Sequence, residues 1–211
     1  YPGVFYAAGT HPMSAATEPL VSVADLVALA DHPKFVGIGE TGLDYHYTAE
    51  SAAIQQESLR IHIEAARQTG LPLIIHARAA DDDMARILAE EHRAGAYSCV
   101  MHCFSSSAEL AKAALDLGFY LSVSGIAAFP KSTELREIFV PILNILNLPF
   151  IETPFLAPPP PRGKRNEPAY AAHTARAAAP VWGLEYDDFA RQTCENFDRL
   201  FTKVAQFEAQ S

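Results

Sequence analysis

The sequence predicts an α/β fold in which helices surround a parallel β-sheet, and three observations support this class. Short apolar runs recur along the chain, and amphipathic segments with helix start and stop signals separate them. The 211 residues, 49% hydrophobic and 19% charged, suit one domain with a sizeable core. Strands that alternate with helices form parallel sheets with the helices outside.

Six apolar runs are typical of buried strands. Each run is short and mostly apolar on both faces, as a strand covered on both sides must be. The runs are residues 4–9, 35–40, 71–76, 98–103, 119–125 and 148–153.

The segments between these runs carry helical signals. One predicted helix ends at Gly70 and shows one face through Ile54, Ser58, Ile61 and Ala65. Residues 81–83 are aspartates that favour a helix start through the helix dipole, and that helix would end at Gly95. Ser106 and Glu109 form a predicted capping box for the next helix. A last helix, expected to close the domain, is marked by Phe189, Thr193, Phe197, Leu200 and Phe201.

The number of strands favours a (β/α)8 barrel of the TIM type that lacks its first βα units. Such a barrel usually needs about 250 residues, and this chain of 211 begins at Tyr1 with a strand close behind. We therefore expect residues 1–211 to form a single hydrolase barrel domain that is incomplete at its amino end. A six-stranded doubly wound sheet is the alternative that the length alone allows.

Charge and composition limit the functional classes. The net charge of -9 argues against a large non-specific nucleic-acid surface, although a bound cation would reverse the local field at a metal site. No apolar run is long enough to cross a bilayer, so we expect no membrane partner. Three cysteines without Cys-x-x-Cys spacing predict a protein of the reducing cytoplasm.

Polar residues stand at the carboxyl ends of the predicted strands, where barrels carry their sites. These residues are His11, Glu40, His76, His102 and the pair at 152–153. Imidazole and carboxylate groups that converge from separate strands are suitable ligands for a divalent cation. A single histidine is more often a hydrogen-bonded structural residue, which we expect for His32, His46, His62, His92 and His173.

Two further features leave alternatives open. Arg78 follows His76 closely and could contact a phosphate or form a surface salt bridge, and Asp44 could assist the site or form a turn. The four prolines 158–161 predict a rigid extended path. Three cations follow them, and they predict either a phosphate-binding rim or a solvated loop: Arg162, Lys164 and Arg165.

Six motifs in this order resemble the TatD family of metal-dependent deoxyribonucleases, within the amidohydrolase-like barrels. They cover almost the whole chain: GTHP at 9–12, GETGLDY at 39–45, LPLIIHAR at 71–78, VMHCFSSS at 100–107, SGIAAFPKS at 124–132 and PFLAPPPPRGKRNEPAY at 154–170. The resemblance implies two divalent metal ions (Mg, Mn or Zn) at the mouth of a barrel. It also implies 3′-5′ exonuclease cleavage of phosphodiester bonds by metal-activated water.

The resemblance also implies roles for individual residues. Glu40 would bridge the two metals, and His76 and His102 would complete the ligands of the second metal. His11 would lie near the substrate phosphate. Contacts to DNA or another phosphodiester substrate would come from Arg78, Arg162, Lys164 and Arg165.

The chain departs from the family pattern at two places. The family's His-x-His pair belongs to a strand before Tyr1, and the usual Asp, a metal ligand and base, is not found after Thr153, where the sequence reads ETPFLAP. Two alternative functions therefore stand beside the nuclease. One is a metal-dependent amide or ester hydrolase, such as an aminoacyl-tRNA deacylase. The other is a catalytically degenerate barrel that only binds.

Overall fold

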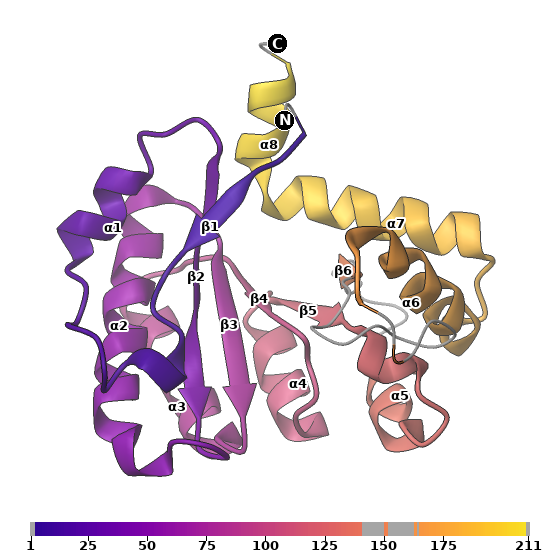
Figure 1. The fold of residues 1–211 in the computed structure, drawn as a ribbon, viewed down its shortest axis with the longest axis horizontal. Helices are drawn as coiled ribbons and strands as arrows, with labels where there is room; N and C mark the ends of the chain where they lie inside the picture. The colour runs from indigo at the N-terminus through magenta and orange to yellow at the C-terminus, as the bar shows by residue number, and fades with distance from the viewer. Residues whose placement is uncertain (1–2, 141–149, 152–162, 164, 210–211) are drawn as a thin grey trace.

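The computed structural model describes residues 3–140, 150–151, 163 and 165–209. Within these residues one sheet contains six strands, and each strand pairs in parallel with the next strand of the sequence (Figure 1). The strands are β1 (Tyr6–Ala8), β2 (Phe35–Asp44), β3 (Leu73–Arg78), β4 (Cys99–Met101), β5 (Tyr120–Val123) and β6 (Phe150–Ile151). Consecutive parallel strands are the arrangement of a β/α barrel wall, in which all carboxyl ends meet at one edge.

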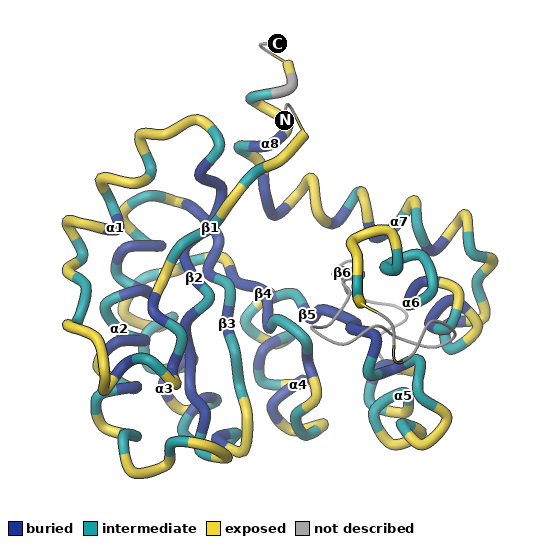
Figure 2. Tube along the Cα trace, viewed as in Figure 1, coloured by how far each residue is buried: buried dark blue, intermediate teal, exposed yellow. Residues whose placement is uncertain are grey.

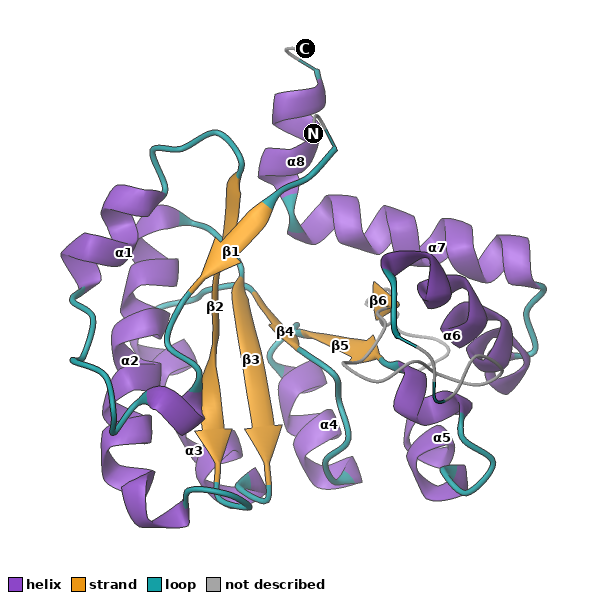
Figure 3. Ribbon diagram, viewed as in Figure 1, coloured by secondary structure: helices purple, strands orange, loops and turns teal. Residues whose placement is uncertain are grey.

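Helices follow the strands along the chain (Figure 3). They are α1 (Val23–Leu29), α2 (Ala52–Thr69), α3 (Asp81–Ala94), α4 (Ala108–Asp116), α5 (Thr133–Phe139), α6 (Ala171–Ala178), α7 (Tyr186–Leu200) and α8 (Thr202–Glu208). Short 3-10 turns cover Pro12–Ser14, Ala49–Ser51, Gly125–Ala128, Pro168–Tyr170 and Ala179–Trp182. In the described part of the chain, no helix is both long and apolar enough to cross a membrane.

The two faces of the sheet pack against different partners. The main core lies between the sheet and helices such as α2 and α3, and it includes Leu73, Ile75 and Met101 (Figure 2). The opposite face, here called the inner face, carries a smaller cluster near the amino ends of the strands. That cluster joins strand residues to α7 and α8 through Val36, Val100, Leu200, Phe201 and Val204, with Ile74 and Tyr120 packed beside them.

The predicted strands are confirmed at five positions, and Phe150–Ile151 represents the sixth. β2 extends further than predicted, to Asp44, because Thr41 to Asp44 continue the ladder with residues 75–78 of β3. Its residues are buried almost throughout, as expected for a strand covered on both sides.

The predicted helix stops are confirmed, and the details of two helices need correction. Gly70 ends α2 in the left-handed conformation with φ 69°, and Gly95 follows α3. Ser107, not Ser106, caps α4: its hydroxyl accepts a hydrogen bond from Leu110 N at 3.3 Å. The helix marked by the phenylalanines is α7, and it is not the last one, because Phe201 ends it and α8 follows.

Candidate metal centre

Three histidines meet around one carboxylate oxygen of Glu40 in β2: His76 belongs to β3, and His11 and His102 follow β1 and β4. Oε1 of Glu40 lies 3.2 Å from His76 Nδ1, 3.7 Å from His11 Nε2 and 3.8 Å from His102 Nε2. The rings of His11 and His76 are in edge contact, with centroids 4.7 Å apart. The structure thus brings together the four strand-end residues that the sequence pattern selected on the first four strands.

Glu40 reaches this position because β2 contains a bulge. Gly39 pairs with Ile74 and Thr41 pairs with Ile75, so Glu40 is the extra residue between two paired neighbours. A bulge turns a side chain away from the regular alternation, and bulges are frequent beside active sites. The irregularity therefore directs the carboxylate toward the histidines.

Glycines on both sides of Glu40 allow β2 to approach β3 closely. Gly39 has φ 132° and Gly42 has φ 142°, which side chains rarely allow. A Cβ at Gly42 would lie 1.9 Å from the carbonyl oxygen of His76, and one at Gly39 would lie 2.5 Å from that of Ile74. Only glycine fits at these two positions.

A buried carboxylate orients the ring of His76. Asp44 is 1% exposed, and its Oδ2 lies 3.0 Å from His76 Nε2. Because an ionised carboxylate only accepts hydrogen bonds, Nε2–H of His76 donates to it. In a neutral ring this leaves the lone pair of Nδ1 on the side of Glu40. Histidine ligands of metals are commonly oriented by a carboxylate in this way.

His11 is held by a different set of bonds. Its Nδ1 accepts a hydrogen bond from Met13 N at 3.2 Å, so in a neutral ring the proton is on Nε2, the nitrogen that faces Glu40. The preceding residue, Thr10, donates its backbone N–H to Nε2 of His62 at 2.9 Å. His62 is fully buried in α2 and in turn donates from Nδ1 to Ser58 O at 2.7 Å. The expected structural role of His62 is therefore confirmed, because it holds the loop that carries His11.

His102 enters the site from the end of β4. Its backbone N–H donates to Ile75 O at 2.7 Å, which extends the β3–β4 pairing to this residue. His102 and His76 each come two residues after an inner-face residue of the small cluster, Val100 and Ile74. Because alternate strand residues share a face, both imidazoles belong to the inner face. Cys103 follows with φ 45°, an unusual value for a side-chain-bearing residue that marks the sharp end of the strand.

The surroundings of the cluster lower the pKa values of Glu40, His11 and Asp44. Burial alone would raise the pKa of Glu40, but its contact with His76 and the electrostatic attraction of the nearby His102 and His11 imidazoles outweigh burial and lower the pKa. Burial, followed by the repulsion from His76, lowers the pKa of His11. Asp44 also has a lowered pKa: burial opposes this, but hydrogen bonds from Tyr47 N and from His76 prevail.

The donor set fits a divalent cation. Ligand atoms from His11, Glu40 and His76 all lie within 4.8 Å of one another, and His102 contacts the same carboxylate. Imidazole nitrogen with carboxylate oxygen is a ligand combination that zinc and other first-row divalent metals accept. The residues at closest range include His11, whereas the sequence predicted Glu40, His76 and His102 as the ligands, so the ligand set stays a prediction.

Comparison with known proteins agrees with the motifs. Residues 1–202 match the sequence model of the family described as TatD related DNase. The chain belongs to the TatD family. Two relatives carry the name uncharacterized metal-dependent hydrolase. YabD of Bacillus subtilis (strain 168) is 39% identical over 95% of this chain and 78% of the relative. YcfH of Escherichia coli (strain K12) is 41% identical over 94% of this chain and 74% of the relative. The protein named 3′-5′ ssDNA/RNA exonuclease TatD of Salmonella typhimurium is 30% identical over 97% of this chain and 80% of the relative.

Solved structures of the TatD family share the fold. The crystal structure of YJJV, a TatD homologue from Escherichia coli K12, superposes with a TM-score of 0.84 at 26% identity over 96% of this chain and 78% of the other. A TatD family hydrolase from Entamoeba histolytica gives a TM-score of 0.78 at 22% identity over 94% and 75% of the two chains. The α/β barrel predicted from the sequence is therefore the fold of this TatD family member.

Of the predicted substrate-contacting cations, the structure describes Arg78 and Arg165. Arg78 is exposed at the end of β3, where its guanidinium carbon lies 4.6 Å from the ring centroid of Tyr47. Arg165 is exposed. The pair at 152–153, prolines 158–161, Arg162 and Lys164 lie outside the described residues.

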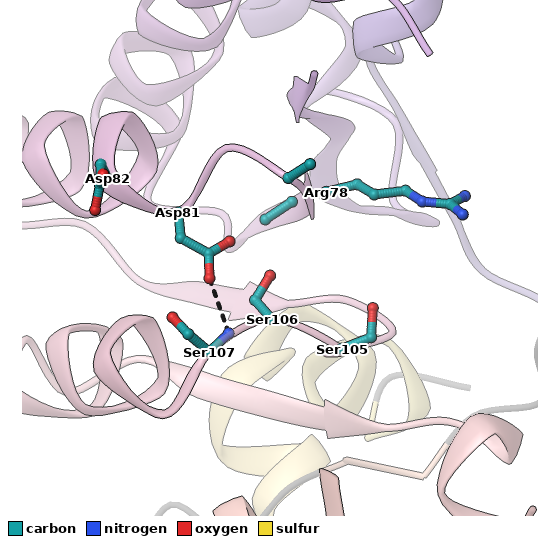
Figure 4. Close-up of a pocket in the computed structure, with 8 residues that line it drawn as sticks. Arg78, Asp81, Asp82, Ser105, Ser106 and Ser107 are labelled. Atoms are coloured by element: carbon teal, nitrogen blue, oxygen red, sulfur yellow. Dashed lines mark hydrogen bonds between the residues drawn. The ribbon is translucent and has the colours of Figure 1, made fainter. Parts of the chain in front are cut away.

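A hollow of about 440 Å³ opens beside the ends of β3 and β4 (Figure 4). Its polar lining comes from the start of α3 and the loop before α4, where Asp81 accepts a hydrogen bond from Ser107 N at 2.8 Å. Arg78 also lines it, but its side chain extends away from Asp81 (Figure 4). The aspartates at 81–83 occupy the first turn of α3, as predicted.

Sequence reasoning left the role of Asp44 open and did not connect His62 with the site. Both residues act through another side chain, since Asp44 orients His76 and His62 holds the loop of His11. For Asp44, the sequence signal for a role at the site was its place four residues after Glu40, near the predicted end of the strand. No sequence signal linked His62 to Thr10, because the two residues meet only where α2 packs against the segment that follows β1.

Proposed function

We propose that this chain is a metal-dependent phosphodiesterase that removes nucleotides from the 3′ end of DNA or RNA. The observation that carries the proposal is the group of His11, His76 and His102 around the carboxylate of Glu40 at the carboxyl edge of a parallel sheet. The TatD family supports metal-dependent hydrolysis, and the exonuclease name of the Salmonella typhimurium relative supports the nucleic-acid substrate.

Glu40, His76 and His102 are the residues that would hold metal. A divalent cation bound there supplies Lewis-acid chemistry, which activates water and offsets the negative charge that develops on the phosphate. We propose two such ions, of the Mg, Mn or Zn type. Asp44 keeps Nδ1 of His76 directed at the site throughout, because its carboxylate holds the opposite nitrogen as a donor.

The remaining polar groups would bind the substrate phosphate. Nε2–H of His11 faces the cluster and is suited to donate to a phosphate oxygen, since Nδ1 is occupied by Met13 N. Arg78 is exposed at the same edge, and guanidinium groups bind phosphate through paired hydrogen bonds. We assign the same role to Arg162, Lys164 and Arg165, which follow the prolines in sequence.

The proposal is tested with metal-stripped protein and a single-stranded oligonucleotide labelled at its 5′ end. Mn²⁺ or Mg²⁺ should restore a ladder that shortens from the 3′ end, and a chelator should stop it. His102→Ala should lower the rate by at least about a hundredfold, since loss of a ligand removes metal affinity and charge stabilisation together. His32→Ala is the matched control, because His32 lies before the amino end of β2, far along the strand from Glu40.

Three results would count against the proposal: hydrolysis that does not depend on metal, full activity in His102→Ala, or loss of activity in His32→Ala as large as in His102→Ala. Faster cleavage of a carboxylic ester than of any oligonucleotide, on the same preparation, would instead indicate the acyl-ester hydrolase.

A further inference from the structure

An exposed aromatic side chain follows the strand that carries Glu40. Tyr47 follows β2, and 55% of it is exposed. The guanidinium carbon of Arg78 lies 4.6 Å from its ring centroid, and the ring of His46 meets it at 4.5 Å with an interplanar angle of 78°. All three side chains are exposed, and we call them the Tyr47 platform.

The Tyr47 platform is fixed to the metal centre through one carboxylate. Oδ1 of Asp44 accepts hydrogen bonds from the backbone N–H groups of His46 at 3.0 Å and Tyr47 at 2.9 Å. Oδ2 of the same carboxylate accepts from His76 Nε2 at 3.0 Å. The position of Tyr47 relative to His76 is therefore set by a buried, charged group rather than by a free loop.

Strand pairing fixes the cationic part of the platform. Asp44 pairs with Arg78 in the β2–β3 ladder, and Tyr45 N donates to Arg78 O at 2.9 Å. Arg78 comes two residues after His76 on the same strand. Its side chain extends away from the hollow at the start of α3 (Figure 4), and its guanidinium is placed over Tyr47.

A single exposed apolar residue is ordinary on a protein surface. Tyr47 differs because a guanidinium lies over its ring and a site carboxylate holds its backbone. A cation over an aromatic face keeps the two groups stacked and leaves guanidinium N–H groups to bind anions. Aromatic rings and guanidinium planes are the surfaces on which unpaired bases stack, with little dependence on base identity.

We propose that the Tyr47 platform stacks a nucleobase of a single-stranded substrate, next to the phosphodiester bond held at the metal centre. The inference rests on the proposed function and deepens it, because it names the side chains that would hold a base beside the cleaved bond. Duplex ends would enter only after their bases separate. Arg78 serves both contacts: its plane lies in the stack and its N–H groups face the backbone phosphate.

Binding without turnover tests the platform directly. The probe is a short single strand with 2-aminopurine at its 3′ end, whose fluorescence falls on stacking, titrated in the presence of a chelator. Tyr47→Leu should weaken binding about tenfold and reduce the quenching, since one base–aromatic stack contributes that much or more. Tyr47→Trp should retain or improve both. Tyr6→Leu is the matched control: Tyr6 is also an exposed tyrosine beside a histidine, His32, but it lies at the amino end of β1.

A cleavage assay distinguishes a wrong proposal about the Tyr47 platform from a wrong proposal about nuclease activity. Two oligonucleotides are compared with Mn²⁺ present, one normal and one with abasic residues at its 3′ end. The parent protein should prefer the normal strand by about tenfold in kcat/KM, and this ratio should fall to near one in Tyr47→Leu. If the parent cleaves neither strand, the proposed nuclease fails and the titration alone decides the platform.

The platform is overturned if 2-aminopurine is not quenched on binding, if Tyr47→Leu and Tyr6→Leu give equal affinities, or if the parent cleaves both strands at equal rates. Both tyrosines are exposed, so the variants are expected to fold, and their thermal unfolding is compared with that of the parent to confirm it.

Discussion

On the inner face of the sheet, the side chains change from apolar to polar within two residues along a strand. On β3 and β4, Ile74 and Val100 pack against α7 and α8, whereas His76 and His102 surround Glu40. The same strands therefore provide an apolar contact at their amino ends and a polar cluster at their carboxyl ends. On β3 and β4 the backbone pairing continues to both ends, so on these two strands the side chains decide what each end does.

This difference separates stability from chemistry within one sheet. Apolar burial at the amino ends stabilises the fold in proportion to the area removed from water. The carboxyl ends gather groups that burial would destabilise if they lacked partners. Substitutions at the amino ends are therefore expected to change the free energy of unfolding, and substitutions at the carboxyl ends to change metal affinity and activity.

The largest expected effect on folding comes from the amino end. Phe201 is 8% exposed and packs in the cluster with Val36 and Val204. Phe201→Ala should lower the free energy of unfolding by about 3 kcal/mol, through lost burial and the cavity left behind. Urea denaturation measures this loss, and metal-dependent activity of the folded variant should remain close to that of the parent.

Phe197→Ala is the control for this substitution. Phe197 contacts the ring of Phe201 but is 37% exposed, so its removal should cost about 1 kcal/mol or less. Equal losses in the two variants would contradict the assignment of the amino end as the stabilising contact.

A smaller effect, on activity, is expected from Asp44→Asn at the carboxyl end. The amide can present N–H to His76 Nε2, which moves the imidazole proton to Nδ1 and removes the lone pair that faces Glu40. Metal affinity and activity should both fall by about 10- to 100-fold. Calorimetric titration with Mn²⁺ measures the affinity, and the oligonucleotide assay measures the rate.

Asp187→Asn provides the comparison for Asp44→Asn, because Asp187 is an exposed carboxylate in the first turn of α7. It should leave metal affinity unchanged. The orienting role of Asp44 would be wrong if Asp44→Asn bound metal as tightly as the parent.

The smallest effect is expected away from both ends. Lys112 and Asp116 form an ion pair of 2.6 Å on α4, with side chains 75% and 63% exposed. Lys112→Ala should change the free energy of unfolding by less than about 0.5 kcal/mol, because water and salt screen exposed pairs. A loss comparable to that of Phe201→Ala would show that stability is not concentrated at the amino ends of the strands.

The sequence was sufficient to predict the strands, the helix stops and the three histidines that surround Glu40. The spacing of apolar residues and the residues that end helices are local signals that can be read from the sequence. Because barrel geometry brings strand ends together, Glu40, His76 and His102 could be selected without coordinates. The family resemblance added the proposed roles.

Contacts that depend on packing were not predictable in the same way. The bulge at Glu40 is a change of register between two strands, and sequence gives no direct sign of it. The choice of Ser107 over Ser106 as the cap of α4 depends on where the chain turns, since Ser107 N also donates to Asp81 of another helix. His62 reaches Thr10 across 52 residues.

Gly42 limits which substitutions the carboxyl edge of this sheet can accept. A methyl group there would sit 1.9 Å from the carbonyl oxygen of His76, so the first atom of any side chain displaces the strand that carries the imidazole. A randomised library across residues 39–47 would therefore lose most of its members at this codon, as it would at Gly39. Holding it as glycine and varying His46 and Tyr47, which are exposed, concentrates the search where the backbone tolerates change.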